Sequence, residues 1–121
     1  MLPRIYRLPL RNEFRRIKKT GKLIQGRFFS LIICSQLSVS SSQSASRFSF
    51  IVSKKISPLA VQRNRIRRLL SEAIYSGIEK IKPGFDFVFL VKKEILNKSF
   101  VEIKKEIESI FANENLIIKA D

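Results

Sequence analysis

The first segment of regular hydrophobic spacing lies near the N-terminus. Leu10, Phe14 and Ile17 recur at the spacing of one helical face and predict a first helix over residues 7–19. The flank of this face is basic and carries Arg11, Arg15, Lys18 and Lys22. We therefore expect an amphipathic helix with one face packed on the protein and the neighbouring face charged.

The middle of the chain has the pattern of extended structure. Residues 22–35 are rich in aromatic and β-branched side chains, and residues 47–53 place apolar side chains at alternate positions, so both segments predict strands. Between them, seven of the twelve residues 35–46 are serine, which predicts a hairpin loop. Residues 85–91 form a continuous apolar run interrupted only by Asp86, which is typical of an interior strand.

Two further helices complete the pattern. Ser57-Pro58 is a favourable helix start, with serine as the cap and proline at the first position. The core-facing stripe that follows consists of Ile66, Leu69, Leu70, Ala73, Ile74, Gly77 and Ile81. The last helix begins with the capping box Ser99-Phe100-Val101-Glu102, and its inner face holds Phe100, Ile103, Ile107, Ile110 and Phe111. The predicted order is α-β-β-α-β-α, with room for one more strand in residues 22–36.

Charge is distributed unevenly over the 121 residues, a length that fits a single domain over residues 1–121. The net charge is +14, of which residues 1–68 supply +15 (sixteen bases, one acid) and residues 69–121 supply −1 (eight bases, nine acids). One strongly basic half beside a neutral half is typical of a nucleic-acid-binding protein. We expect no membrane partner, because no apolar run approaches the roughly 18 residues of a membrane span.

The densest charge lies at the start of the second predicted helix, in residues 54–68. This run holds six positive charges and no negative one: Lys54, Lys55, Arg63, Arg65, Arg67 and Arg68. Closely spaced arginines repel one another on a solvated face, whereas a polyanion placed against them exchanges its counterions for guanidinium groups. At about 100° per residue, Asn64, Arg67 and Arg68 face away from the core. Arg63 and Arg65 flank the apolar stripe.

The chain is a poor candidate for a catalyst on its own. It has no histidine and one cysteine, which excludes a His-based triad and a zinc site. In the basic half the only carboxylate is Glu13, so there is no cluster of acids for a metal-dependent nuclease. Cys34 lies in an apolar, strand-like run, and we expect a reduced core residue in a cytoplasmic protein.

Several motifs resemble the bacterial ribonuclease P protein subunit in residue type, order and spacing. The most specific is Arg63-Asn64-Arg65-Ile66-Arg67-Arg68-Leu69, preceded by Ser53-Lys54-Lys55. The N-terminal half adds Arg7-Leu8, Asn12-Glu13-Phe14, Gly21-Lys22 and Arg27-Phe28-Phe29. The C-terminal half adds Phe85-Asp86-Phe87-Val88 and Ser99-Phe100-Val101-Glu102. The resemblance therefore covers nearly the whole chain.

The resemblance implies both a fold and a function. The fold is an α/β (α+β) two-layer sandwich of α-β-β-β-α-β-α order, with about four strands and a left-handed β-α-β crossover, although most such crossovers are right-handed. In the family, the RNA subunit with bound magnesium removes the 5′ leader of precursor tRNA by endonucleolytic hydrolysis. The protein binds the catalytic RNA and the leader, is not catalytic alone, and is expected as a monomer within the holoenzyme.

The resemblance also implies which residues bind RNA. The RNA subunit would contact Lys54, Lys55, Arg63, Asn64, Arg65, Arg67 and Arg68. The leader would lie in a cleft between the first helix and the sheet, against Phe14, Lys18, Ser30, Ile32 and Arg63, where backbone charge and aromatic stacking act together. Lys18 and Ile32 stand where the family often has aromatic residues, and Gln62 is an extra residue before Arg63. We therefore expect weaker stacking, with Lys18 offering a phosphate contact instead.

The residues alone leave several alternatives open. Phe14, Ser30 and Ile32 fit core positions as well as a leader site, and Asn64 could hydrogen-bond the local backbone. A structural RNA-binding protein of the ribosome would share the charge, and co-purification with ribosomes would identify it. A self-sufficient nuclease would cleave precursor tRNA without the RNA subunit.

Overall fold

The computed structural model describes residues 2–36 and 45–118. Its main elements are α1 (Leu10–Thr20), β1 (Lys22–Gln25), β2 (Phe29–Ser35), β3 (Arg47–Ile51), α2 (Ala60–Ser76), β4 (Phe85–Val91) and α3 (Phe100–Asn113). Short 3-10 helices include η1 (Arg4–Tyr6), η3 (Ile78–Lys80) and η4 (Lys93–Ile95). The predicted order α-β-β-β-α-β-α is confirmed, and the extra strand is β1.

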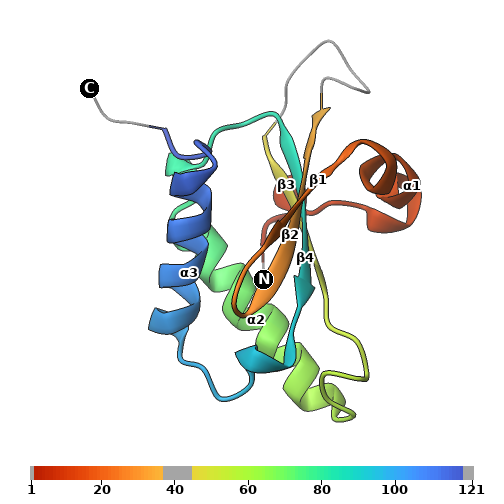
Figure 1. Ribbon diagram of the computed structural model, residues 1–121, viewed down its shortest axis with the longest axis vertical. Coiled ribbons are helices and arrows are strands. Elements are labelled where there is room, and N and C mark those ends of the chain that lie inside the picture. The colour runs from red at the N-terminus through yellow and green to blue at the C-terminus, as the bar shows by residue number, and fades with distance from the viewer. Residues whose placement is uncertain (1, 37–44, 119–121) are drawn as a thin grey trace.

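The four strands form one sheet in the order β1-β2-β4-β3 (Figure 1). β2 pairs antiparallel with both β1 and β4, and β3 pairs parallel with β4. The prediction of a hairpin between residues 35 and 46 is therefore wrong, because β4 lies between the two strands that this hairpin would join. Most of the serine-rich segment, residues 37–44, lies outside the described residues.

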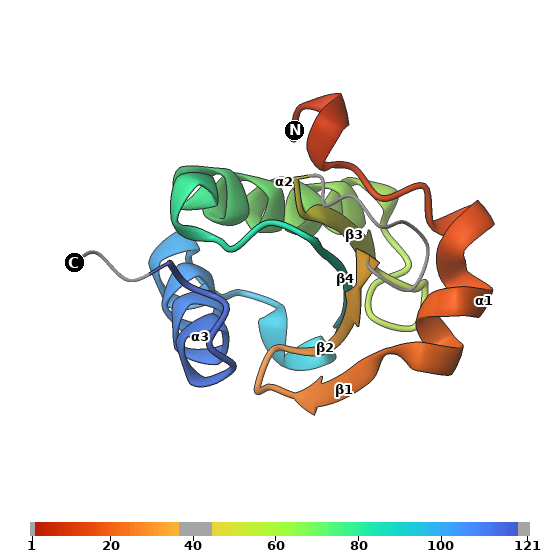
Figure 2. The same cartoon turned by 90° about the horizontal axis from the view of Figure 1, so that it is seen from above.

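The helices cover the sheet from two sides. α2 and α3 lie together on one face, and α1 lies on the other (Figures 1 and 2). The sandwich of a sheet and a helical layer is confirmed, with α1 added on the second face. In Figure 1, β3 lies behind β4, both strands run downward, and α2 lies to the left, so the β3–α2–β4 crossover is left-handed.

The main core lies between the sheet and the α2/α3 layer. Phe29, Phe87 and Phe89 point into it with no solvent exposure, and Phe111 of α3 closes it from the other side. Ring centroids lie 4.8 Å apart for Phe29–Phe89 and 5.0 Å apart for Phe87–Phe111. Tilted aromatic pairs at this spacing add to the stabilisation from burial. The prediction of β4 as an interior strand is confirmed.

Two helix starts differ from the sequence prediction. α1 begins at Leu10 rather than Arg7, because Arg7 forms an isolated bridge with Phe48 and the N–H of Leu8 donates to the Phe48 carbonyl at 2.9 Å. α2 begins at Ala60, so Ser57 is not its cap. The Ser57 hydroxyl accepts the N–H of Leu59 at 3.2 Å and bonds to the Gln62 side chain, which holds this segment outside the helix.

The predicted cap of the last helix is confirmed. The Ser99 hydroxyl accepts the N–H of Glu102 at 3.2 Å, and α3 begins at Phe100. Such a cap satisfies one of the four backbone N–H groups that have no partner within the helix.

Gly21 brings α1 close to the sheet. A Cβ atom at this position would lie 2.5 Å from both the Ile17 carbonyl oxygen and Cγ2 of Ile32. Since one of these atoms belongs to the backbone of α1 and the other to β2, a side chain here would push the helix away from the strand.

We expect Gly21→Ala to lower the free energy of unfolding by about 1–3 kcal/mol, the usual cost of overpacking. Gly77→Ala is the matched control, because a Cβ there meets nothing within 4 Å. The control should change stability by less than about 1 kcal/mol, in the stabilising direction. Urea unfolding of both variants measures the difference, and equal losses would contradict the close approach at Gly21.

Candidate nucleic-acid interface

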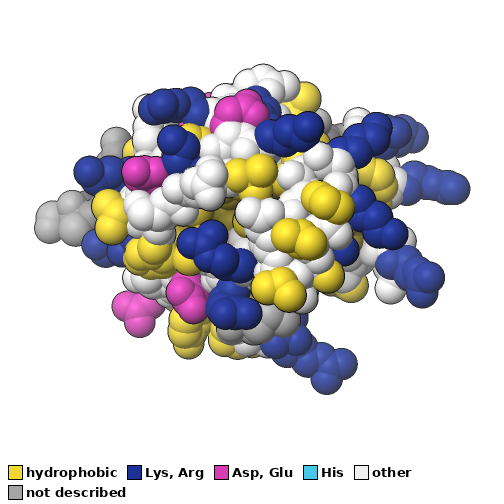
Figure 3. Space-filling view, turned by 90° about the horizontal axis from the view of Figure 1, so that it is seen from below, with side chains coloured by type: hydrophobic (Ala, Val, Ile, Leu, Met, Phe, Trp, Pro, Cys, Tyr) yellow, Lys and Arg dark blue, Asp and Glu magenta, His cyan; other side chains and the backbone are white. Residues whose placement is uncertain are grey.

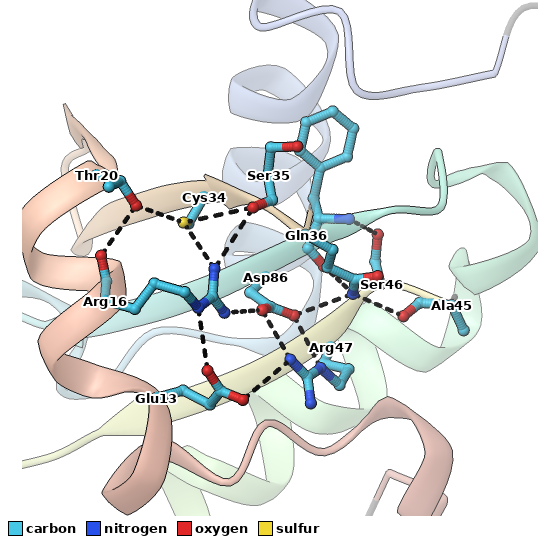
Figure 4. A network of polar contacts seen from close by, with 11 residues as sticks. Glu13, Arg16, Thr20, Cys34, Ser35, Gln36, Ala45, Ser46, Arg47 and Asp86 are labelled. Carbon is cyan, nitrogen blue, oxygen red and sulfur yellow. Dashed lines mark hydrogen bonds and ion pairs between the residues drawn. The ribbon is translucent and has the colours of Figure 1, made fainter. Parts of the chain in front are cut away.

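A buried carboxylate connects α1 to the centre of the sheet. The Asp86 side chain on β4 has no solvent exposure, and Arg47 of β3 grips both of its oxygens with two hydrogen bonds of 2.9 Å. Arg16 of α1 donates to the same carboxylate from above, and the Gln36 amide donates to it at 3.0 Å (Figure 4). Three segments of the chain, namely α1, the residue after β2 and the start of β3, therefore donate hydrogen bonds to one carboxylate on β4.

Arg16 has further partners that fix the rotation of α1. Its Nε donates to Glu13 at 3.0 Å, and Nη1 lies 3.1 Å from the sulfur of Cys34. Thr20, one turn later, lies 3.2 Å from the same sulfur. Ile17 lies between these two residues in sequence and is fully buried against Cys34 and Val88. Phe14 and Lys18, on the flank of this buried face, are thereby left exposed.

The ion pairs determine the protonation of the buried carboxyl. Burial by itself raises the pKa of Asp86, but the hydrogen bonds from Arg47, Gln36 and Arg16 outweigh it and hold the pKa below its ordinary value. Burial opposes the charge of Arg16 as well, yet its bonds to Asp86 and Glu13 raise its pKa. The pKa of Arg47 is raised chiefly by its hydrogen bonds to Asp86. All three groups are therefore charged at neutral pH.

Four of the five leader-site residues predicted from the sequence lie on α1 or β2, and the fifth, Arg63, lies at the start of α2. Phe14 is 37% exposed and belongs to neither apolar cluster of the described residues, so the alternative of a core residue is wrong. Lys18 is exposed one turn later. Ile32 is half-buried beside Val88. Ser30 is buried, and its hydroxyl donates to the Gln25 side chain at 2.9 Å.

The arginines at the start of α2 divide into held and free side chains. Arg63 is half-buried and donates to the Ser57 carbonyl at 2.9 Å. Arg67 donates to the Asn64 side chain at 2.9 Å, so Asn64 orders a neighbouring arginine rather than the backbone. Arg65 and Arg68 are exposed, and neither forms an ion pair among the described residues.

The segment 52–59 lies between the basic side chains of α1 and the arginines at the start of α2. It lies on the α1 side of the sheet and leads from β3 to the start of α2 (Figures 1 and 2). Lys54 and Lys55 are exposed on it. Seen from below, Lys and Arg side chains crowd the side of the molecule where α1 lies, and most of the visible acids lie toward the opposite side (Figure 3). The geometry thus presents one broad basic surface that extends from α1 to α2.

Comparison with known proteins identifies the family. A family model described as Ribonuclease P matches residues 2–114. The chain belongs to the ribonuclease P protein family. Among relatives, the ribonuclease P protein component of Clostridioides difficile is 34% identical over 108 residues, which cover 88% of this chain and 90% of that protein. The component of Bacillus velezensis is 33% identical, with 94% and 93% covered.

Solved structures of ribonuclease P proteins share the fold. A Staphylococcus aureus RNase P protein superposes with a TM-score of 0.77 at 23% identity, covering 92% of this chain and 96% of that chain. The Thermotoga maritima RNase P protein gives a TM-score of 0.76 at 24% identity, covering 88% and 96%.

The described residues, 2–36 and 45–118, contain no cluster of three metal-ligating side chains (His, Cys, Asp or Glu) that could hold a metal ion. Glu13 and Asp86, the two carboxylates that meet between α1 and the sheet, are both engaged by arginine. In the same part of the chain, no helix is long and apolar enough to cross a membrane.

The sequence did not predict the contact between Arg16 and Asp86 that holds α1 against the sheet. The sequence marked Asp86 as an interruption of an apolar run and as part of the motif Phe85-Asp86-Phe87-Val88, and it marked Arg16 and Arg47 only as members of the basic half. A signal was present, because a lone carboxylate inside an interior strand requires a cationic partner. The identity of that partner depends on contacts 39 and 70 residues away in sequence.

We expect Asp86→Asn to lower the free energy of unfolding by about 3–5 kcal/mol, because it leaves Arg16 and Arg47 without their shared counter-charge. Glu13→Gln is the control and should cost only about 0.2–1 kcal/mol, since this carboxylate is partly exposed.

The same pair of variants tests the pH dependence. Because the pKa of Asp86 is lowered by folding, its contribution is fully present above about pH 4 and is lost as pH falls further. The parent should lose stability below about pH 4 more steeply than Asp86→Asn, in urea unfolding at a series of pH values. Parallel curves for the two proteins would contradict an ionised Asp86.

Proposed function

We propose that this chain is the protein subunit of the ribonuclease P ribonucleoprotein. It binds the catalytic RNA and the 5′ leader of precursor tRNA and assists magnesium-dependent endonucleolytic removal of the leader. The observation that carries the proposal is the family match over residues 2–114, on a chain whose basic side chains crowd the side of the molecule where α1 lies (Figure 3). It acts in the cytoplasm as one copy per holoenzyme.

The first turns of α2 contact the RNA subunit. Arg65 and Arg68 are exposed without a carboxylate partner among the described residues, so phosphate groups are their natural counter-charges. Arg63 and Asn64 order this surface, Arg63 by its bond to the Ser57 carbonyl and Asn64 by accepting a bond from Arg67. Lys54 and Lys55 extend the contact along the segment 52–59. The extra Gln62 is accommodated by its bond to Ser57.

The α1 side contacts the leader. Phe14 offers an exposed ring on which a base can stack, and Lys18 offers a charge one helical turn away for a phosphate. Ile32 supplies apolar contact only. The Ser30 hydroxyl is engaged by Gln25, so Ser30 acts through the shape of the surface rather than through a free donor.

The polypeptide contributes binding and positioning, and the RNA subunit performs the cleavage. Magnesium is held mainly by the RNA subunit, in keeping with the engaged carboxylates Glu13 and Asp86. The chain's own basic groups neutralise phosphates on both RNAs, which lowers the repulsion between the leader and the catalytic RNA.

Reconstitution tests the function. We expect purified RNA-free protein with magnesium to leave precursor tRNA intact, and the same protein with a bacterial RNase P RNA to release the leader at its 5′ end. The RNA subunit alone, at the same moderate salt, is the control and should bind precursor more weakly. Cleavage by RNA-free protein, or no effect of the protein on the RNA enzyme, would refute the proposal.

Phe14→Ala tests the leader surface. We expect the affinity of the holoenzyme for leader-bearing precursor to fall by about 1–3 kcal/mol, the range for one stacked base. Mature tRNA, which lacks the leader, should bind as before. Since Phe14 is exposed, the variant should melt near the parent temperature. Unchanged precursor binding would remove Phe14 from the site.

Lys18→Phe is the companion variant. It exchanges a phosphate contact for a second ring, so leader binding should become less dependent on salt, by about one unit of log–log slope. Binding of precursor at a series of salt concentrations measures the slope, and an unchanged slope would place Lys18 outside the leader site.

A further inference from the structure

A small pocket opens where the N-terminal segment, the outer edge of β3 and α2 meet. Its volume is about 190 Å³, and Arg7, Arg67, Ser49, Ser71 and Phe50 line it. Ordinary small-molecule pockets span roughly 300–1,000 Å³, so this one has room for a single nucleotide part, such as a phosphate or a base. The α2 side of the sheet, where Phe50 packs, is opposite to the side that carries Phe14.

The charge of the pocket is uncompensated. No carboxylate lines it, and among the described residues neither Arg7 nor Arg67 forms an ion pair. Each guanidinium is oriented by one bond: Arg7 Nε donates to the Leu2 carbonyl at 2.7 Å, and Arg67 Nη1 donates to Asn64 at 2.9 Å. The remaining N–H groups of both forks are available to phosphate oxygens, which guanidinium groups bind with paired hydrogen bonds.

Hydroxyl and backbone groups complete the lining. Ser71 is 4% exposed and lines the cavity from α2. Ser49 lines it through its backbone, because the side chains of its neighbours Phe48 and Phe50 point to the α2 side of the sheet. The Phe48 carbonyl points to the outer edge of β3, where it accepts the N–H of Leu8. By strand alternation Phe50 directs its N–H and carbonyl to the same edge, two residues beyond that contact. A base or phosphate in the pocket would therefore meet both donors and acceptors.

We propose that this pocket binds one nucleotide of the RNA subunit, with Arg7 and Arg67 on the same phosphate. The proposal rests on the proposed function and deepens it. Arg67 lies within the run 63–68 that faces the RNA subunit, whereas the leader contacts lie across the sheet. The pocket thus adds Arg7, from the far end of the chain, to the surface that holds the catalytic RNA.

A double-mutant cycle tests the shared phosphate. Arg7→Gln and Arg67→Gln should each weaken assembly with a bacterial RNase P RNA about tenfold or more, the range for a charged hydrogen bond. The double variant should lose far less than the product of the two, because the nucleotide is released once either arginine is gone. Arg4→Gln is the control. Arg4 is exposed on η1 and does not line the pocket, so this substitution removes one positive charge from the same segment and leaves the pocket unchanged. It should cost less than about threefold and combine multiplicatively with Arg67→Gln.

Chemical probing of the assembled RNA supplies a second measurement. One nucleotide should be protected by the parent and by Arg4→Gln, and exposed with Arg7→Gln and with Arg67→Gln. Arg67→Gln leaves the N-terminal segment intact, so it decides the question if Arg7→Gln melts early. Multiplicative losses, or protection that persists in both variants, would overturn the proposal.

Two further outcomes assign a failure to its cause. A parent protein that binds no RNase P RNA would refute the proposed function itself. Normal assembly of Arg7→Gln with weakened binding of leader-bearing precursor would overturn the inference alone, because the nucleotide would then belong to the substrate.

Discussion

Asp86 lies in the central strand without contact to solvent, and a carboxylate in that position is stable only when guanidinium groups and hydrogen-bond donors surround it. This requirement determines where α1 can lie, because Arg16 must reach over the sheet to β4. It also fixes the start of β3, where Arg47 binds the same carboxylate from the neighbouring strand. Once these contacts form, Ile17 is buried and Phe14 faces outward. The position of the proposed leader surface therefore follows from a charge beneath it.

The elements governed by local patterns could be predicted from the sequence. The cap of α3, the apolar stripe of α2 as far as Ile74 and the interior character of β4 depend on residues a few positions apart, and the structure confirms them. The predicted end of that stripe is wrong, because α2 ends at Ser76, before Gly77 and Ile81. The order of the strands could not be predicted, because the pairing of β4 with both β2 and β3 is settled by packing between distant segments. The start of α2 was misplaced because Ser57 bonds Gln62 and Leu59 instead of capping the helix.

The arginines show why the candidate site was predicted only in part. In sequence they all look alike, and the basic half appeared to be one charged surface. In the structure Arg16 and Arg47 neutralise a buried acid, Arg63 and Arg67 each donate one hydrogen bond to a nearby residue, and Arg65 and Arg68 are exposed without an ion pair among the described residues. Only burial and hydrogen bonding distinguish these roles. The contacts with RNA and with the leader stay predictions, since they depend on surfaces that this chain does not contain.

The strand order also has a consequence for how the chain reaches its native state. Among the described residues, β4 is the last strand in sequence, yet it lies between β2 and β3 in the sheet. During synthesis from the N-terminus, β2 and β3 must therefore wait with unpaired edges until residue 91 has left the ribosome. The segments that wait belong to the half with a net charge of +15, and mutual repulsion between such segments opposes edge-to-edge aggregation. The charge that suits this protein to RNA thus also keeps its incomplete sheet soluble.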